Sequence, residues 1–127
     1  MTVTGGVVER FSSGHPKITY TVGAAVTAAR LVELTGNRTI GPAGAGSFKV
    51  CGVAMQSADA VNDKVMVMSG GVVNLRAGGA IAAGDYLISG ALGVVVSAGV
   101  APDARTVIGQ ALEAIVNGND GPVRLLL

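Results

Sequence analysis

The sequence repeats itself at a spacing of about 55 residues, and this constrains the fold more than any other feature. The segment VGAAVTAARLVEL, residues 22–34, aligns without a gap on AGGAIAAGDYLIS, residues 77–89. The alignment matches glycine with glycine and branched aliphatic residues with each other: Gly23 with Gly78 and Val26 with Ile81. The chain therefore contains two copies of one pattern.

A second pair of segments extends the duplication toward the C-terminus. VCGVAMQSADAVNDKVMVM, residues 50–68, aligns on VIGQALEAIVNGNDGPVRLLL, residues 107–127. The matched residues are Gly52 with Gly109, Ala54 with Ala111, and Asn62-Asp63 with Asn119-Asp120, so the spacing grows from 55 to 57 and 58. Small insertions in the loops of the second copy explain this growth. We expect two similar halves that share one core.

The local pattern within each copy is that of β-strands. Twenty glycines separate short runs of β-branched residues at intervals of about 8–12 residues, which is typical of an all-β barrel or sandwich. We predict very little helix, at most one turn each in SADAV and LEAIV. The segment VMVMSGGVVNL reads as a tight hairpin, because Gly70-Gly71 can take the positive φ that such turns need, and ISGALGVVV reads as a second hairpin. The predicted strands are 18–22, 30–35, 48–55, 64–68, 71–75, 85–89, 93–97, 106–112 and 122–127.

Residues 1–17 lie outside the repeat. We therefore divide the chain into an N-terminal arm, 1–17, and a single β domain, 18–127, with halves at about 18–68 and 71–127. The arm could be an edge strand or a disordered end. Our sharper hypothesis is an arm that orders on a partner. Its candidate contact residues are three apolar anchors and two polar residues: Val7, Val8, Phe11, Glu9 and Arg10.

Charge is sparse and evenly spread. Charged residues make up 13% of the chain and the net charge is +1, whereas globular proteins average about 25% charged residues. There is no basic stripe to bind nucleic acid and no apolar run long enough to span a membrane, and the N-terminus does not have the pattern of a signal peptide. We infer that much of the surface contacts other protein surfaces.

Few residues could support catalysis, and none forms a recognisable site. His15 is the single histidine and Cys51 the single cysteine, so a metal site is not expected. A set of Ser13, His15 and Asp59 lacks a nucleophile elbow. GPAGAG lacks the Lys-Ser/Thr ending of a phosphate loop, and NGNDG lacks the distal acid of a calcium loop. We predict a non-enzymatic protein without cofactor or metal.

The motif GGAIAAGDYLI also occurs, in similar form, in hairpins of biotinyl and lipoyl carriers. A carrier presents its modified lysine at a tight turn, but the corresponding turn here holds Ser69, Gly70 and Gly71. The first copy has Ala29-Arg30 where the second has Gly84-Asp85, so the acid is not needed for the geometry. We expect Gly84-Asp85 to bend the chain.

The order of four phrases resembles the small capsid cement (head decoration) proteins of tailed bacteriophages. These phrases are VGAAVTAARLVEL, VCGVAM, AGGAIAAGDYLIS and TVIGQALEAIVNGNDGPVRLLL, and together they cover about residues 18–127. The closing phrase carries most weight, with its Ile-Gly, its Ala-Leu-Glu-Ala, its Gly/Asn/Asp turn and its terminal Val-Arg-Leu strand. The N-terminal segment is longer than the start expected for this family.

The resemblance implies a non-enzymatic role on the outer surface of an expanded phage head. Such a protein is made in the cytoplasm of the bacterial host and binds the major capsid protein, often as a homotrimer, without nucleic acid or membrane as partner. Many weak contacts repeated over a symmetric shell give avidity without a deep pocket. The alternatives are another β-rich structural or binding module, such as a tail or fibre component of the virion, and the carrier domain.

Overall fold

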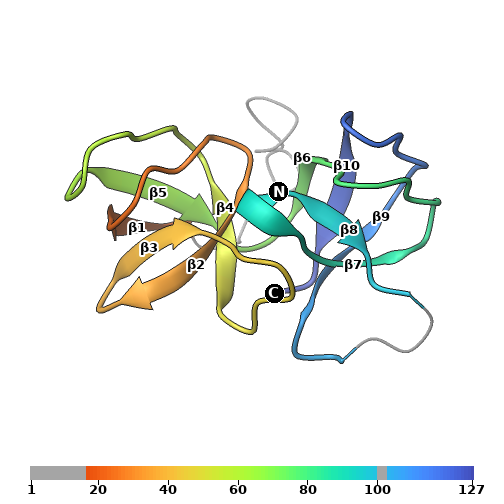
Figure 1. The fold of residues 1–127 in the computed structure, drawn as a ribbon, viewed down its shortest axis with the longest axis horizontal. Helices are drawn as coiled ribbons and strands as arrows, with labels where there is room; N and C mark the ends of the chain where they lie inside the picture. The colour runs from red at the N-terminus through yellow and green to blue at the C-terminus, as the bar shows by residue number, and fades with distance from the viewer. Residues whose placement is uncertain (1–16, 100–102) are drawn as a thin grey trace, which may run out of the picture.

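The computed structural model describes residues 17–99 and 103–127. Within them lie ten strands and one short 3-10 helix, η1. Figure 1 shows the two halves side by side along the longest axis. The strands and the helix are β1 Lys17–Val22, β2 Leu31–Gly36, β3 Thr39–Pro42, β4 Val50–Ala54, β5 Lys64–Met68, β6 Val72–Arg76, β7 Tyr86–Ser89, η1 Ala91–Gly93, β8 Val95–Ser97, β9 Val107–Ala111 and β10 Asp120–Leu125.

The two halves have the same strand order. The first is a closed barrel in the order β1-β3-β2-β4-β5, and the second is a sheet in the order β6-β10-β9-β7-β8. The parallel pairing of β1 with β3 closes the first barrel. A single parallel bridge between Ala77 and Val95 stands at the equivalent place in the second half. The prediction of an all-β fold built from two similar halves is confirmed.

Matched hydrogen bonds show that the halves are equivalent in detail. The Gly23 N–H donates to the Ile40 carbonyl at 2.9 Å, and the Gly78 N–H donates to the Val95 carbonyl at 2.7 Å. In the same way, the N–H groups of Ala29 and Gly84 donate to the carbonyls of Ala54 and Ala111. Ala29 and Gly84 both have positive φ, 62° and 88°.

Each half requires a glycine at a position where the backbone of the neighbouring strand leaves no room for a Cβ atom. A Cβ atom at Gly52 would lie 2.5 Å from the Met68 carbonyl oxygen, and one at Gly109 would lie 2.6 Å from the Arg124 carbonyl oxygen. These glycines are matched in the sequence repeat, so the repeat preserves a packing requirement and not only a turn.

The buried residues form two clusters. One fills the first barrel and contains Val22, Val32, Ile40, Val65 and Val67 among others. The larger cluster fills the second half and also includes residues from the outer side of the first barrel, among them Leu31, Val53 and Met68. The halves therefore share one continuous apolar contact.

All nine predicted strands agree with the structure to within two residues at each end; the strand predicted at 93–97 begins two residues later, as β8. β3 was missed, because its Thr-Ile-Gly-Pro sequence contains two residues that are poor strand formers. The second predicted hairpin is confirmed by the pairing of β7 with β8.

The first predicted hairpin, around Gly70-Gly71, is wrong. β5 pairs with β1 and β4, whereas β6 pairs with β10. Gly71 does adopt a positive φ of 86°, but this turn carries the chain from one half to the other. Positive φ permits a reversal without requiring the two flanking strands to pair.

The proposed helical turns in SADAV and LEAIV are also wrong. Neither segment is helical, and each makes an isolated antiparallel bridge: Ala58 with Val26, and Ile115 with Ile81. Only one short helical segment occurs in the described residues, at Ala91–Gly93.

The alignment of the polar turns is wrong by one residue. The Asn62 N–H donates to the Val22 carbonyl, and the equivalent donor to Ala77 is Gly118. Asn62 and Gly118 share a positive φ, 77° and 84°. Asn62 therefore corresponds to Gly118 and not to Asn119, because the left-handed position defines the turn and both asparagine and glycine tolerate it.

Candidate interaction surface

The outward sides of the two halves differ in chemistry at equivalent positions. In the first half, strand pairing places Leu31 beside Val53 and Val53 beside Met68. The same rungs in the second half hold Tyr86, Gln110 and Arg124. The first row is fully apolar and buried against the second half. The second row is amphipathic, and Tyr86 is 48% exposed.

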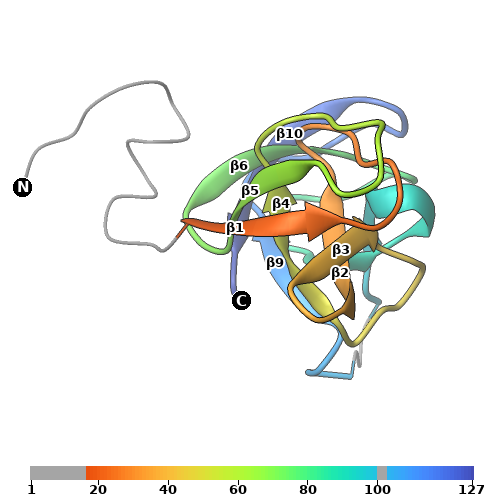
Figure 2. The ribbon, with the colours of Figure 1, turned by 90° about the vertical axis from the view of Figure 1, so that its left-hand side faces the viewer.

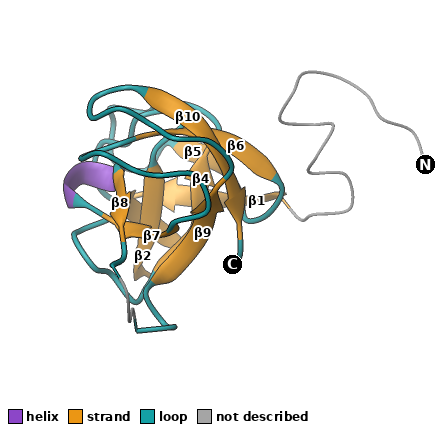
Figure 3. Cartoon of the chain, turned by 90° about the vertical axis from the view of Figure 1, so that its right-hand side faces the viewer, coloured by secondary structure: helices purple, strands orange, loops and turns teal. Residues whose placement is uncertain are grey.

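We call the second row, together with Leu112, the outer face of the second half. Leu112 follows β9 as Met55 follows β4, and it is 46% exposed. Figure 3 looks at the molecule from the side of the second half and shows β7, β9 and β10, with the C-terminus beside β9. A hollow of about 320 Å³ on this side is lined by Tyr86, Ala104, Val107 and Leu126.

Hydrogen bonds hold the polar side chains of the outer face in place. The Arg124 Nη2 donates to Gln110 Oε1 at 2.6 Å, and Gln110 Nε2 donates to the Gly84 carbonyl at 3.2 Å. The aliphatic stems of these side chains therefore lie across the sheet. An ordered surface of tyrosine, arginine and leucine has the composition of protein–protein contacts.

The glycine-rich loop, residues 41–46 of the first half, is hydrogen-bonded to the second half. The Ser89 hydroxyl donates to the Gly44 carbonyl at 2.7 Å and accepts from the Ser47 N–H at 3.1 Å. The Gly46 N–H donates to the Ser89 carbonyl at 2.8 Å. The loop uses its N–H and carbonyl groups within the protein, which agrees with a connecting role and not with phosphate binding.

A carboxylate also binds this loop. The Gly44 N–H donates to Glu33 Oε1 at 3.1 Å. Hydrogen bonding by the Ser47 side chain, followed by that of the Gly44 backbone, lowers the pKa of Glu33. The carboxylate of Glu33, on β2, is thereby held ionised against the loop.

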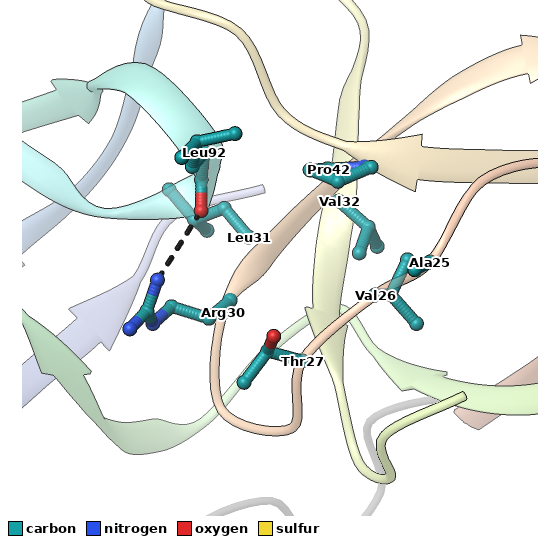
Figure 4. A pocket seen from close by; sticks show the side chains of 8 residues that line it. All are labelled: Ala25, Val26, Thr27, Arg30, Leu31, Val32, Pro42 and Leu92. Atoms are coloured by element: carbon teal, nitrogen blue, oxygen red, sulfur yellow. Dashed lines mark hydrogen bonds between the residues drawn. The ribbon is translucent and has the colours of Figure 1, made fainter. Parts of the chain in front are cut away.

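A second hollow lies between the first barrel and η1. It has a volume of about 170 Å³, and Figure 4 shows its eight lining side chains, with the Arg30 Nη1 donating to the Leu92 carbonyl. Arg30 is the single ionisable residue among them, since the others are Ala25, Val26, Thr27, Leu31, Val32, Pro42 and Leu92. One cation among apolar and hydroxyl groups provides no acid–base pair.

The remaining candidates from the sequence have structural roles. Asp85 Oδ2 accepts from the Ala82 N–H at 3.0 Å, so Gly84-Asp85 does bend the chain. Asp120 of NGNDG pairs with Arg76 at 3.1 Å. Burial raises the pKa of Cys51 to about 11, so its thiol is protonated at neutral pH. The Ser69–Gly71 turn joins the halves and is not the hairpin tip that a carrier needs.

Other predictions fall outside the part of the chain that the structure describes. The arm residues Val7, Val8, Glu9, Arg10 and Phe11 belong to 1–16, as do Ser13 and His15. Asp59 is described and exposed. Within the described ranges, no group of three or more histidine, cysteine or acidic residues could hold a metal ion. A helix long and apolar enough to cross a membrane is likewise not found there.

The outer face was missed by sequence reasoning. The sequence alignment of the two copies already showed this chemical difference, because it matches Leu31 with Tyr86 and Val53 with Gln110. The sheet pairing was needed to show that these positions form one row and that the first row is covered.

Comparisons with known proteins identify relatives of this chain. The family model for the phage cement protein matches residues 11–127. No curated protein matches. Among solved structures, the crystal structure of head fiber gp8.5 N base in bacteriophage phi29 aligns with a TM-score of 0.69 at 24% identity, covering 87% of this chain and 92% of that one. At this identity the second match establishes a shared fold.

Proposed function

We propose, from the premise that this chain belongs to the phage cement protein family, that it is a non-enzymatic decoration protein of the phage head. Membership of the family makes it a phage structural protein. Our proposal goes further: the protein binds the outer surface of the expanded head, as a trimer, and stabilises contacts between major capsid protein subunits. The match over residues 11–127 is the observation that carries this proposal.

The chemistry of the described surface supports a binding role. It exposes large apolar side chains, among them Phe48 and Leu92. The hollow between the first barrel and η1 has one ionisable side chain, Arg30, in its lining. A shell protein needs many repeated surface contacts more than a pocket.

We assign the capsid contact to the arm, residues 1–17. Val7, Val8 and Phe11 would anchor it, and Glu9 and Arg10 would make polar contacts. The family match begins at residue 11, so most of these residues precede the segment that the family shares. The arm could then adapt the domain to one particular coat protein.

The first experiment is co-sedimentation of the purified protein with expanded, undecorated heads of the phage that encodes it. Unexpanded heads serve as the control. We expect saturable binding near one copy per coat subunit on expanded heads only. No binding to either form would exclude the capsid role.

Deletion of residues 2–14 tests the arm. The deleted protein should keep the circular dichroism spectrum of the intact domain but should no longer sediment with expanded heads. A matched control is Val61→Asp, an exposed position far from the arm in sequence, which should bind as the wild type does. Full binding by the deletion variant would contradict the assignment.

A second candidate is the base of a fibre on the virion. The fold shared with the head fiber base of phi29 over most of both chains favours this alternative. Electron microscopy of decorated heads separates the two. Density limited to the domain at many equivalent sites supports a cement protein, whereas sparse sites carrying longer projections, or binding to tails instead of heads, support a fibre component.

A further inference from the structure

The first half shows how this type of outer face is covered. Its row of Leu31, Val53 and Met68 belongs to the same buried cluster as the interior of the second half. At the junction, Val73 and Asn74 of β6 line a hollow of about 280 Å³ together with Val53 and Met55. The start of β6 is therefore part of the surface with which the second half contacts the first.

The first half carries the equivalent of this surface, and there it is uncovered. Ile18 pairs with Val67 as Val73 pairs with Val123, so Ile18-Thr19 corresponds to Val73-Asn74. Val73 is 4% exposed, whereas Ile18 is 40% exposed. We call Ile18-Thr19, the counterpart of Val73-Asn74, the β1 surface.

Each chain thus has both sides of one contact, used once internally and left open once. Figure 2 views the end of the molecule where β1 lies, and Figure 3 views the opposite end, where β7 and β9 lie. Ile18, Tyr86 and Leu112 all stay exposed, so the β1 surface and the outer face do not cover each other within one chain.

We propose that a second copy of this chain docks its β1 surface on the outer face of the second half. This contact between two chains would have the same arrangement as the contact between the two halves of one chain. It is head-to-tail, so it forms a closed ring or an open filament according to the rotation between copies. This inference rests on the proposed function for the number of copies, because a trimer would then be a ring of six similar halves.

The residues of the outer face suit a contact that must also tolerate water. Tyr86 and Arg124 replace the buried Leu31 and Met68 of the first half. Tyrosine and arginine are enriched in the centres of interfaces between proteins that also exist apart. Leu112 and Ile18 supply the apolar contact.

The test is the self-association of the full chain, measured by sedimentation velocity without heads. We expect the wild type to sediment as more than one chain at concentrations of tens of micromolar. Ile18→Asp and Leu112→Asp should each weaken association by at least about tenfold, as expected for an interface anchor. Val116→Asp is the matched control, because Val116 is 68% exposed and belongs to neither surface. Ile18→Ser and Leu112→Ser serve as milder variants if an aspartate impairs folding.

Mixing the two variants tests the head-to-tail arrangement. The Ile18→Asp chain keeps an intact outer face, and the Leu112→Asp chain keeps an intact β1 surface. An equimolar mixture should therefore recover a complex of one chain of each kind, held by one intact contact. A wild type that stays a monomer throughout, or variants that assemble as the wild type does, would overturn the inference.

The deletion of residues 2–14 separates this inference from the proposed function. We expect the deleted chain to self-associate normally while losing its binding to heads. If the β1 surface is instead covered by the chain's own arm, the deletion will increase self-association and the intact chain will be a monomer, which counts against our proposal. A monomer that binds expanded heads would refute the inference alone, and an oligomer that does not bind them would refute the function alone.

Discussion

The contact of Ser89 with the glycine-rich loop offers a direct test of how the two halves are held together. Ser89 is 1% exposed, and its hydroxyl makes hydrogen bonds of 2.7 Å and 3.1 Å with Gly44 and Ser47. Ser89→Ala removes both bonds and keeps the Cβ atom, so the change in packing is small. Each intramolecular hydrogen bond contributes about 0.5–1.5 kcal/mol net to the free energy of unfolding.

We expect Ser89→Ala to lower the free energy of unfolding by about 2 kcal/mol, because two bonds are lost and water can reach only part of the freed backbone groups. For a chain of this length, that corresponds to a fall in Tm of about 7 °C. Urea unfolding followed by far-UV circular dichroism is the suitable assay, since the chain has no tryptophan.

Ser97→Ala is the matched control, because Ser97 lies on β8 of the same sheet and is exposed. Its effect should stay within about 0.5 kcal/mol. If Ser89→Ala is as stable as Ser97→Ala, the loop does not contribute to joining the halves and our reading of residues 41–46 is wrong.

Three further changes test other parts of the structure. Leu125→Asp places a charge where the side chain is 6% exposed and should prevent folding, because an unpaired buried charge costs several kcal/mol. The control Leu127→Asp, at a position that is 48% exposed, should fold. A soluble, folded Leu125→Asp protein would show that this strand is peripheral. Because the pKa of Glu33 is lowered in the folded protein, its carboxylate should stabilise the fold above the ordinary pKa of this group, and that contribution should be lost as pH falls through the folded pKa. Glu33→Gln should therefore make the free energy of unfolding less dependent on pH in the acid range. An unchanged pH dependence would contradict this. Because the pKa of Cys51 is about 11, its alkylation near pH 8 should be slow in the folded protein and fast in urea; fast alkylation of the folded protein would show that the thiol is not protected.

Much of the fold was accessible from the sequence because glycine positions and β-branched runs report local geometry. Gly52 and Gly109 marked equivalent close approaches of two strands, and the strands themselves were found to within two residues except for β3. Pairing between distant strands was less accessible. The turn at Gly70-Gly71 has the backbone of a tight turn, yet the strands on either side pair elsewhere, because local conformation does not choose the partner strand.

The candidate surface was harder to predict for a related reason. Residues that are far apart in sequence, such as Tyr86, Gln110 and Arg124, become one row only through the sheet register. Their exposure also depends on whether another element covers them, as the second half covers Leu31, Val53 and Met68. The arm, residues 1–17, remains a prediction from sequence.

The divergence of the two outward rows follows from their different surroundings. In the first half the row is permanently covered, so Leu31, Val53 and Met68 can be fully apolar. If the second half kept the same three residues, the free chain would expose a contiguous apolar face, and such faces promote aggregation. Tyr86, Gln110 and Arg124 keep the face soluble, and the hydrogen bonds from Arg124 to Gln110 and from Gln110 to Gly84 hold its side chains in place. A duplicated half that had lost its covering and bound nothing would tolerate any polar residue at these positions. The ordered tyrosine and arginine beside the exposed Leu112 therefore argue for a partner. The β1 surface of another copy is the partner we propose, because its counterpart on β6 lies beside the first row inside the chain.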